Sequence, residues 1–403
     1  MNAVVQTMRR LSRYALLIAA AAAVGCAIGA VWNWPSFLRA YLYAWLVVLG
    51  LSLGGMALVM IHNLTGGVWG LYIRRIAEAQ MRTLPLVAAL AIPLVIGLRQ
   101  IYPWASIEAE PSPSTSDFWR HYLEPSFFFG RAAGYFVVWL VLTALLTRWS
   151  RGQDSSPNVR RFWRAYKVSG FGLLALGVTV HFASIDWIMS LARGFTSTAL
   201  GPVMFANQVL SAYSLCVVIG AWLVVTPEFE HIVSSKAVTD LGSLLLTMLT
   251  LWAYLAWFQF MLVWMADLPH DNVWYLVRWR DGWGVAGAIL LLFQFVLPFF
   301  LLLLRVVKQS PRALSAVAAL VFTGQLVATY AQVGPLLNMP GWANHWVDLL
   351  TPLALGGIWF ASFTWLLARR PLLPVYDMNY EQAFLLREID LEEVARDEAL
   401  AHG

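Results

Sequence analysis

Charged residues are scarce in this chain, and hydrophobic residues are in excess. Asp, Glu, Lys and Arg make up 12% of the 403 residues, whereas hydrophobic residues make up 60%. A soluble globular domain carries about 25% charged residues, because its surface has to be hydrated. The composition therefore excludes a soluble globule and indicates an integral membrane protein.

Cysteine is almost absent, and the two that occur, Cys26 and Cys216, lie in apolar stretches. A CxxCH haem attachment, an iron–sulfur cluster or a zinc site needs more cysteines or closer spacing. The 7 histidines are dispersed along the chain, so we also expect no bound metal or haem. Any electron transfer would then need a carrier on another chain or a lipid-soluble quinone.

Several apolar stretches are long enough to cross a bilayer, since a membrane-spanning helix needs about 20 apolar residues. They cover residues 14–32, 41–62, 84–102, 127–147, 168–189, 203–225, 241–265, 284–304, 313–333 and 347–367. The sequence therefore predicts an all-α polytopic membrane domain over residues 1–376. Residues 377–403 form a charged tail whose apolar residues recur at helical spacing, which predicts a short amphipathic helix.

Lys and Arg are unevenly distributed between the two sides of the membrane. With a cytoplasmic N-terminus, most of the 27 Lys and Arg residues fall in cytoplasmic loops, in agreement with the positive-inside rule. Both termini are therefore predicted to be cytoplasmic. This distribution explains the net charge of +5 without a nucleic-acid partner, and membrane lipids are the expected surroundings.

The first apolar stretch allows two interpretations. Its basic start and small residues, "MRRLSRYALLIAAAAAVGCAIGA", are typical of a signal peptide. The apolar run continues to Trp32, however, and is longer than a signal-peptide core of about 7–15 residues. We therefore expect a retained helix, whereas cleavage would leave one span fewer with the loops on the same sides.

His181 and Asp186 are the most informative polar residues, because they lie in the outer half of the predicted fifth span. Ionisable groups inside a membrane protein usually face a bundle interior or a polar cavity. On a helix the two residues are separated by about 140° and about 7.5 Å, so they would line one cavity from two angles. Near a quinone headgroup they could accept the protons of quinol. The structural alternative is a hydrogen-bonded histidine and an aspartate that caps the span.

Other polar residues of the spans are weaker candidates for a quinone site or a proton path. Tyr254 and Gln259 lie deep in the seventh span, and Asp240 opens it on the cytoplasmic side. Interhelical hydrogen bonds explain most such groups, and residues at the membrane boundary, such as His62 and Asn63, are usually solvated.

Two outer loops are candidate docking surfaces for an extracytoplasmic partner. The acidic loop of residues 103–126 is interpreted first as a solvated cap. The second loop, "ADLPHDNVWYLVRWRDGWG", mixes charge with tryptophan beside the bilayer, which favours an ordered interfacial element or a simple membrane anchor. Its docking candidates are Asp267, His270, Asp271, Arg278, Arg280 and Asp281.

Two stretches carry a resemblance to a known family. "HFASIDWIMSL" followed by "FTST", and "WAYLAWFQFMLVWMADLPHDNVWYLVRWRDGWG" followed by "FVLPFFLLL", resemble the ActF-type membrane subunit of bacterial alternative complex III. That subunit belongs to the NrfD-like, polysulfide-reductase-type group. The resemblance implies two four-helix bundles, formed by spans two to five and six to nine. It also implies a place in a quinol:cytochrome c oxidoreductase of the bacterial inner membrane.

The same resemblance implies which partners would carry the redox groups. They are a homologous NrfD-like membrane subunit, an iron–sulfur protein, and multihaem and monohaem c-type cytochromes, and these hold the clusters and haem. His181 and Asp186 occupy the position of the family's polar pair. This chain departs from the family pattern after Leu191, because Ala192 and Arg193 replace a Pro-His step. The missing histidine weakens the case for quinol oxidation on this subunit, while Arg193 could stabilise a carboxylate or a quinone oxygen.

Three functions remain as hypotheses. The first is a subunit of a quinol-oxidising respiratory complex, which contributes a quinone pocket or proton path, anchors extracytoplasmic redox subunits and is not catalytic alone. The second is a secondary transporter, although no pair of Gly/Pro-broken spans occupies matching positions in two halves. The third is a purely structural membrane anchor.

Overall fold

The structure, a computed structural model, describes residues 2–105, 117–153, 159–192, 194–226, 235–279, 282–337 and 346–372. These residues form helices and no strands, and 10 of the helical stretches are long and apolar enough to cross a membrane. The prediction of an all-α polytopic membrane protein is therefore confirmed. Arg193, Arg280, Asp281 and the predicted tail helix lie outside the described residues.

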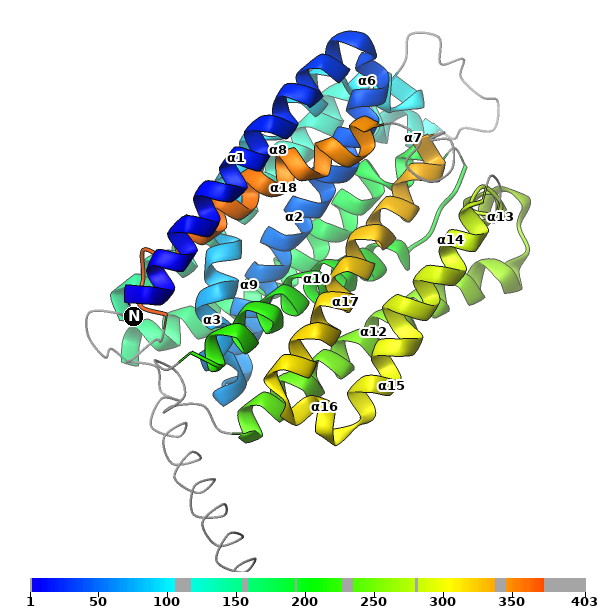
Figure 1. Cartoon of the computed structure of the whole chain (residues 1–403). Helices are drawn as coiled ribbons and strands as arrows, with labels where there is room; N and C mark the ends of the chain where they lie inside the picture. The colour runs from blue at the N-terminus through cyan, green and yellow to red at the C-terminus, as the bar shows by residue number, and fades with distance from the viewer. Residues whose placement is uncertain are drawn as a thin grey trace, which may run out of the picture.

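The spans run back and forth along one common direction (Figure 1). In chain order they are α1 (Asn2–Trp32), α2 (Trp34–Thr65), α3 to α5 (Val68–Met81, Leu84–Ala89 and Ile92–Ile96), α8 (Pro125–Gln153), α9 (Val159–Trp187), α10 (Leu200–Val224), α12 (Ser235–Ala266), α14 and α15 (Trp283–Leu290 and Leu297–Leu303), α17 (Pro311–Val333) and α18 (Trp346–Leu367). Short helices connect them: α6 (Leu98–Ile101), α7 (Asp117–Tyr122), α13 (Pro269–Leu276) and α16 (Arg305–Gln309), with 3-10 turns at Pro103–Ala105, Met189–Leu191 and Gly334–Leu337.

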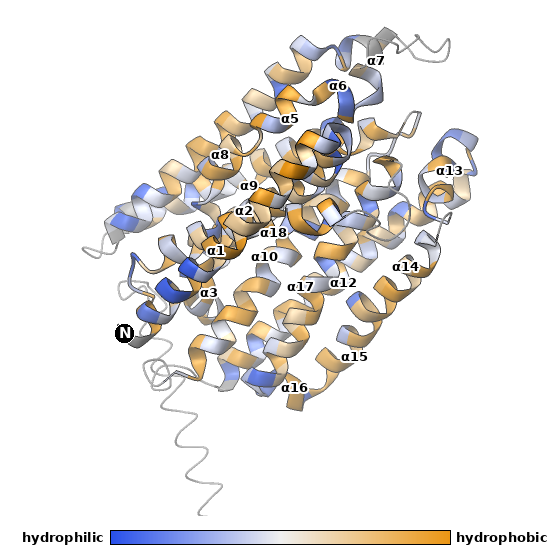
Figure 2. Cartoon of the chain, turned by 45° about the horizontal axis from the view of Figure 1, so that its top comes forward, coloured by the Kyte–Doolittle hydropathy of each residue, from blue (hydrophilic) through white to orange (hydrophobic). Residues whose placement is uncertain are grey.

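The two ends of the bundle differ in the helices they carry. We call the end with the N-terminus and α16 the basic end, and the end with α6, α7 and α13 the opposite end (Figure 1). Figure 2 shows hydrophobic residues along the length of the helices, whereas hydrophilic residues gather at the start of α1 and around α13 and α16. This distribution is the one that a bilayer around the middle of the bundle would favour.

The helices α2 and α10 form the centre of the molecule. In their most apolar windows 89% and 78% of the residues are buried, against 22–39% in the other spans. A helix that is hydrophobic on all sides fits either the core of a protein or the lipid, and α2 and α10 occupy the core of this bundle. Glycines of α2 allow the close approach: a Cβ at Gly54 would collide with the carbonyl oxygen of Gln208 and with Ala212, both on α10.

The remaining spans are arranged around this central pair. Spans two to five pack together through α2–α3, α2–α9 and α8–α9, and spans six to nine through α10–α12, α10–α17 and α12–α15. The first and last spans, α1 and α18, lie side by side along the edge of the bundle (Figure 1). Gly25 and Gly29 of α1 sit directly against Leu350 and Val347 of α18, a contact that cleavage of the first span would remove.

The third span differs from its predicted bounds of 84–102. The helical stretch that could cross the membrane begins at Val68 and ends at Ile96. It is interrupted around Thr83 and Ala91, two residues before Pro85 and Pro93, because proline cannot donate the helical hydrogen bond. The apolar pattern missed its first half because that half carries buried charged residues, which are described below.

The eighth span contains a π-helical segment, Leu291–Val296. Pro298 follows it at the start of α15, and a proline ring clashes with the carbonyl group four residues earlier, here that of Gln294. The wider π-turn relieves this clash. Pro352, in contrast, lies inside an unbroken α18.

Candidate functional site

Asp186 is a carboxylate buried at the end of α9, with 0% of its surface exposed. Arg131 of α8 donates to both carboxylate oxygens, over 3.0 Å from Nε to Oδ2 and 2.8 Å from Nη2 to Oδ1. The hydroxyl of Tyr135, one turn further along α8, donates to Oδ2 over 2.9 Å. A buried carboxylate persists only when it is paired and fully hydrogen-bonded, and these contacts meet that requirement.

The two partners meet because they lie at the same depth in neighbouring antiparallel spans. Arg131 is in the second turn of α8, which begins at Pro125, and Asp186 is next to the last residue of α9. The end of α9 is held in place by Ser190, whose Oγ donates to the Asp186 carbonyl over 2.6 Å. Tyr102 donates in the same way to the carbonyl of Trp187 over 3.2 Å, so the last two carbonyl groups of the helix are satisfied.

Arg131 also connects Asp186 to the short helix α7. Its Nη1 donates to the carbonyl oxygen of Tyr122 over 2.7 Å. Its guanidinium carbon lies 3.7 Å from the ring centre of Tyr122 and 4.5 Å from that of Phe127, both favourable cation–π distances. Burial, and then the negative charge of Asp186, raise the pKa of Tyr122, so the phenol stays protonated.

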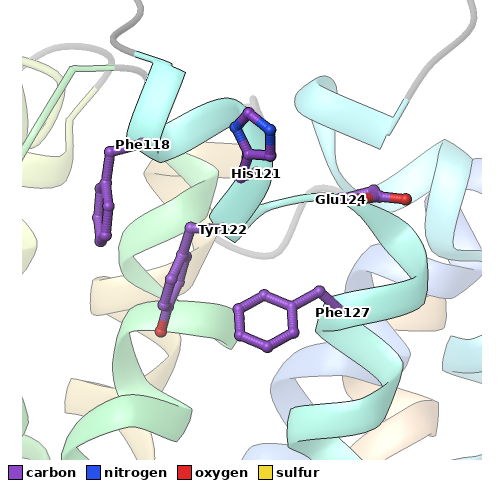
Figure 3. A pocket seen from close by; sticks show the side chains of 5 residues that line it. All are labelled: Phe118, His121, Tyr122, Glu124 and Phe127. Atoms are coloured by element: carbon purple, nitrogen blue, oxygen red, sulfur yellow. The ribbon is translucent and has the colours of Figure 1, made fainter.

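A hollow of about 320 Å³ opens above this ion pair at the opposite end of the bundle. Its lining comes from α7, the connection after it and the start of α8: Phe118, His121, Tyr122, Glu124 and Phe127. Figure 3 shows the Tyr122 and Phe127 rings at the lower side, His121 above them and Glu124 turned to the side. The hollow therefore combines aromatic walls with two titratable groups at its rim.

An aromatic layer closes the space beneath the ion pair. Trp187 packs against Trp45 of α2 and Trp139 of α8, with ring centres 5.0 Å and 6.0 Å apart. Trp139 is fully buried and donates its indole N–H to Thr179 over 2.8 Å. These rings separate Asp186 from the middle of the bundle and exclude water from that side.

His181 lies on α9 but is not joined to Asp186 by a hydrogen bond. Its ring packs onto the start of α10, where a Cβ at Gly201 would collide with Nδ1. Asp186 instead points to α8, as the different helical angles of the two residues require. Among the described residues, the structure therefore places His181 and Asp186 against different neighbours. The hollow is separated from Asp186 by Arg131, whose guanidinium stacks on the lining residues Tyr122 and Phe127.

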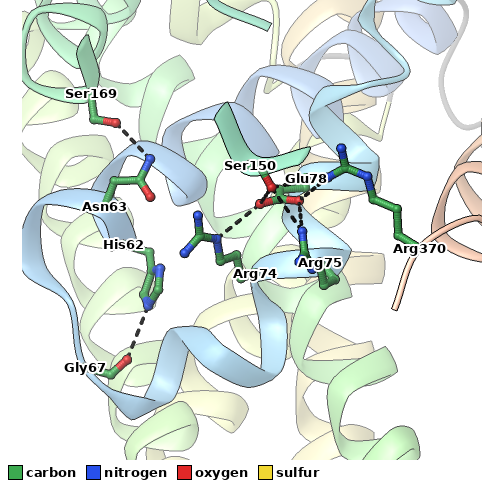
Figure 4. Close-up of polar contacts among 9 residues, drawn as sticks. All are labelled: His62, Asn63, Gly67, Arg74, Arg75, Glu78, Ser150, Ser169 and Arg370. Atoms are coloured by element: carbon green, nitrogen blue, oxygen red, sulfur yellow. Dashed lines mark hydrogen bonds and ion pairs between the residues drawn. The ribbon is translucent and has the colours of Figure 1, made fainter. Parts of the chain in front are cut away.

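The three further candidates of the seventh span are dispersed along α12. Tyr254 is 61% exposed on the outer face of the helix, whereas Gln259 is 4% exposed and faces the bundle. Asp240 is exposed at the basic end, close to Lys236. The structure brings none of them next to Asp186. The predicted solvation of His62 and Asn63 is wrong, because both are buried, and Asn63 donates to Ser169 over 3.0 Å (Figure 4).

Of the four described docking candidates, two face inward. Asp271 accepts from the backbone N–H of Thr196 over 3.2 Å. Arg278 donates to the carbonyl groups of Trp274 and Gln332, and its guanidinium stacks on Trp274 at 3.8 Å. Burial lowers the pKa of Arg278 below its usual value. These contacts hold α13 against the bundle.

The other two docking candidates remain at the surface of this end. Asp267 accepts a hydrogen bond from Asn272 over 2.8 Å and adopts a positive φ of 46°. The side chain of His270 is 52% exposed, with Nε2 3.6 Å from an oxygen of Asp271. Asp267 and His270 are therefore the described candidates that a partner could reach.

A second, smaller cavity of about 30 Å³ is lined by residues of α2, α10 and α17. Asn207, Gln208, Ser211 and Thr329 supply its polar lining. The side-chain oxygens of Asn207 and Gln208 are buried and accept no hydrogen bond from the described residues. Because a water molecule needs about 10–15 Å³ and several polar partners, this cavity has room for about two waters.

Two charged residues that form buried ion pairs near the ends of the bundle, Arg131 and Glu78, were not predicted from the sequence. Neither residue was singled out from the sequence as a candidate. A signal for each exists in the sequence: Arg131 is a lone cation within an apolar span, and Glu78 follows Arg74 and Arg75 at helical spacing. Neither signal identifies the partner in another span.

No family model and no curated protein matches this chain. Within the described residues, no three His, Cys, Asp or Glu side chains form a group that could hold a metal ion. The function is therefore argued from the geometry of the chain itself.

Proposed function

We propose that the chain is an integral membrane subunit of a bacterial respiratory complex that oxidises quinol and passes electrons to cytochrome c or another high-potential acceptor. The basic end faces the cytoplasm, so the Arg131–Asp186 pair and its hollow lie on the extracytoplasmic side. The membrane fold and the resemblance of residues 181–191 and 252–284 to ActF-type subunits support this assignment. The observation that carries it is the aromatic hollow beside the ion pair.

The lining of the hollow suits a quinol headgroup. The headgroup is a flat ring, and flat rings stack favourably on aromatic side chains such as Phe118, Tyr122 and Phe127. A volume of about 320 Å³ is near the lower limit for small-molecule sites, so the hollow would hold the ring while the apolar tail extends along the outside of the bundle.

The rim of the hollow carries the groups that the chemistry requires. Oxidation of quinol to quinone releases two protons and two electrons. His121 and Glu124 are placed to accept the protons at the aqueous edge, because imidazole and carboxylate side chains are the usual general bases in proteins. The electrons pass to an iron–sulfur or haem group of a partner subunit.

Arg131 and Asp186 have a positioning role in this proposal. Nε and Nη2 of Arg131 bind Asp186, and Nη1 binds the carbonyl of Tyr122. The pair therefore fixes α7, and with it the rings of Tyr122 and Phe127, against the ends of α8 and α9.

The test is the steady-state oxidation of quinol by the intact complex. Loss of the Phe118 ring in Phe118→Ala should raise the KM for quinol about fivefold, since an aromatic stacking contact contributes about 1 kcal/mol. His121→Gln should lower kcat by about 100-fold or more. The matched control is Phe171→Ala, which removes a ring that is 80% exposed on α9, far from the hollow. An unchanged KM in a normally assembled Phe118→Ala complex would exclude the hollow as the quinol site.

A membrane anchor is the second candidate, and the outer face of α12 favours it. Tyr254, Trp257, Phe258 and Trp264 are 43–66% exposed there, forming an aromatic surface on which a second membrane subunit could pack. Under this alternative, the hollow variants leave turnover unchanged, whereas Trp257→Ala releases the partner subunits in mild detergent.

Nothing in the described spans favours the transporter. The two irregular spans are the third and the eighth. The third is the second member of spans two to five, whereas the eighth is the third member of spans six to nine. They therefore do not form the matched pair of broken helices typical of transporters. Purification in mild detergent separates these functions: co-purifying haem and iron–sulfur proteins support a complex subunit, and isolation of the chain alone supports transport.

A further inference from the structure

The smaller cavity, lined by residues of α2, α10 and α17, has a polar side that the proposed quinol site does not use. Its volume is about 30 Å³, and its polar lining comes from α10 and α17: Asn207, Gln208, Ser211 and Thr329. The lining from α2 is apolar and includes Gly50, where a Cβ would lie 3.1 Å from Cγ of Gln208. Because Gly50 is halfway along a membrane span, the cavity lies at the depth of the hydrocarbon core, where polar groups need partners inside the protein.

The hydrogen bonds around the cavity leave acceptors unused. Asn207 donates through Nδ2 to the hydroxyl of Thr329 over 3.2 Å, and that hydroxyl donates to the carbonyl of Gln325 over 2.9 Å. Ser211 donates to the carbonyl of Asn207 over 2.7 Å, so both hydroxyl groups have used their only proton. Oδ1 of Asn207 and Oε1 of Gln208 are buried and accept no hydrogen bond from a described residue. A ligand of this cavity therefore has to donate hydrogen bonds.

Water is the ligand that matches this lining. One water needs about 10–15 Å³, so the cavity has room for about two. Of the hydrogens that two waters carry, one joins the waters to each other, and the others are available to Asn207 Oδ1, Gln208 Oε1 and the Ser211 oxygen. A cation would also bind to oxygens, but no acidic side chain is among the described residues that line the cavity, and an uncompensated charge at this depth is costly.

Two further buried amides lie next to this lining. Gln325 is one turn along α17 from Thr329 and hence on the same face. It is 0% exposed, and neither Nε2 nor Oε1 has a hydrogen-bond partner among the described residues. Gln294, in the π-helical segment, packs on Gly324, where a Cβ would lie 2.8 Å from its own Cβ, and its Nε2 also lacks a described partner. Buried polar groups are normally bonded to protein or to ordered water, so this face of α17 favours hydration.

We propose that the cavity binds a pair of ordered water molecules, which donate hydrogen bonds to Asn207, Gln208 and Ser211. The waters occupy the space that Gly50 leaves beside Gln208 and satisfy the acceptors of α10 at the depth of the hydrocarbon core. They form a polar site where spans two, six and nine meet, and this site shares no residue with the hollow at the opposite end.

X-ray radiolysis of the full chain in lipid nanodiscs, followed by peptide mass spectrometry, tests this proposal. Radiolysis of a bound water produces a hydroxyl radical, which oxidises the side chains in contact with that water. Met204 lines the cavity although it is only 4% exposed, whereas Met56 of α2 is 0% exposed and is not part of the lining. Met204 should therefore be oxidised severalfold faster than Met56. Equal rates in the unmodified chain would overturn the proposal.

Asn207→Leu tests the polar lining, because leucine is similar in size but accepts no hydrogen bond. The oxidation of Met204 should then fall to the rate of Met56. The matched control is Asn63→Leu. Asn63 is 8% exposed against 5% for Asn207, and it also donates to a hydroxyl group of another span, that of Ser169, but near the far end of α2. Met204 should be oxidised in this control as in the unmodified chain. Rapid oxidation that persists in a folded Asn207→Leu chain would show that the polar lining does not hold the water.

The same variants distinguish water from a cation. The denaturant midpoint of the unmodified chain should be equal in sodium, ammonium and choline chloride of the same ionic strength. A midpoint that rises in sodium or ammonium, and no longer does so in Asn207→Leu, would identify a cation as the occupant and overturn the proposal.

Discussion

The buried Arg131–Asp186 pair predicts a large loss of stability when only one of its two charges is removed. Asp186→Asn keeps the shape of the side chain but removes its charge, while the Arg131 side chain, 12% exposed, keeps its own. Removing one partner of a buried ion pair costs about 3–5 kcal/mol, mainly because the remaining charge is left without compensation. Arg131→Gln should cost a similar amount, because the fully buried carboxylate of Asp186 then keeps only the hydrogen bond from Tyr135.

The double variant distinguishes this explanation from general damage to the site. With both charges gone, neither residue leaves an unpaired ion, so Asp186→Asn with Arg131→Gln should cost little more than either single change. The coupling free energy should therefore be about 3 kcal/mol. Denaturant unfolding in mixed micelles measures it, and Asp240→Asn, an exposed carboxylate, is the control, expected within about 0.5 kcal/mol of the unmodified chain. Additive losses in the double variant would refute the ion pair as the stabilising contact.

Two further predictions concern the basic end and the centre of the bundle. Glu78→Gln should lower the free energy of unfolding by about 3 kcal/mol or more, since Arg74, Arg75 and Arg370 lose their carboxylate; a loss no larger than that of Asp240→Asn would contradict this. Gly54→Ala should cost about 1–3 kcal/mol through overpacking, because its Cβ would meet the backbone of α10. Gly130→Ala, whose Cβ would meet nothing within 4 Å, should be neutral or stabilising in the same denaturant unfolding assay, and equal losses would contradict the packing argument.

The membrane fold could be predicted from the sequence, but the bounds of the third span could not. Apolar runs identify membrane spans because a segment in lipid has to form all its backbone hydrogen bonds within itself, as a helix does. The first half of the third span was missed because hydropathy along the sequence counts Arg74, Arg75 and Glu78 as hydrophilic residues. In three dimensions both arginines donate to Glu78, and all three side chains are buried.

The candidate site was predicted in part. Asp186 was expected to face the interior of the bundle, and it is buried there. The two residues were expected to line one cavity, but His181 packs against α10 and Asp186 binds Arg131 of α8. The partner Arg131 could not be derived, because hydropathy gives the depth of a residue but not its neighbour in the next span. The hollow depends on how α7 folds back over α8, which no local pattern determines.

The docking loop shows a similar limit. Mixed charge beside tryptophan predicted an ordered element, and α13 is ordered. Composition could not show that Asp271 and Arg278 bind groups of their own chain while His270 stays exposed. Whether a charged side chain faces a partner or the chain itself depends on the orientation of the helix.

The most direct test of the quinol site is photolabelling of the intact complex with an azido-quinone, followed by peptide mapping. The proposal predicts that the label attaches within residues 117–131, which contain the whole lining of the hollow, and that excess natural quinol prevents the labelling. Labelling confined to the α12 surface around Tyr254, or to partner subunits alone, would contradict it.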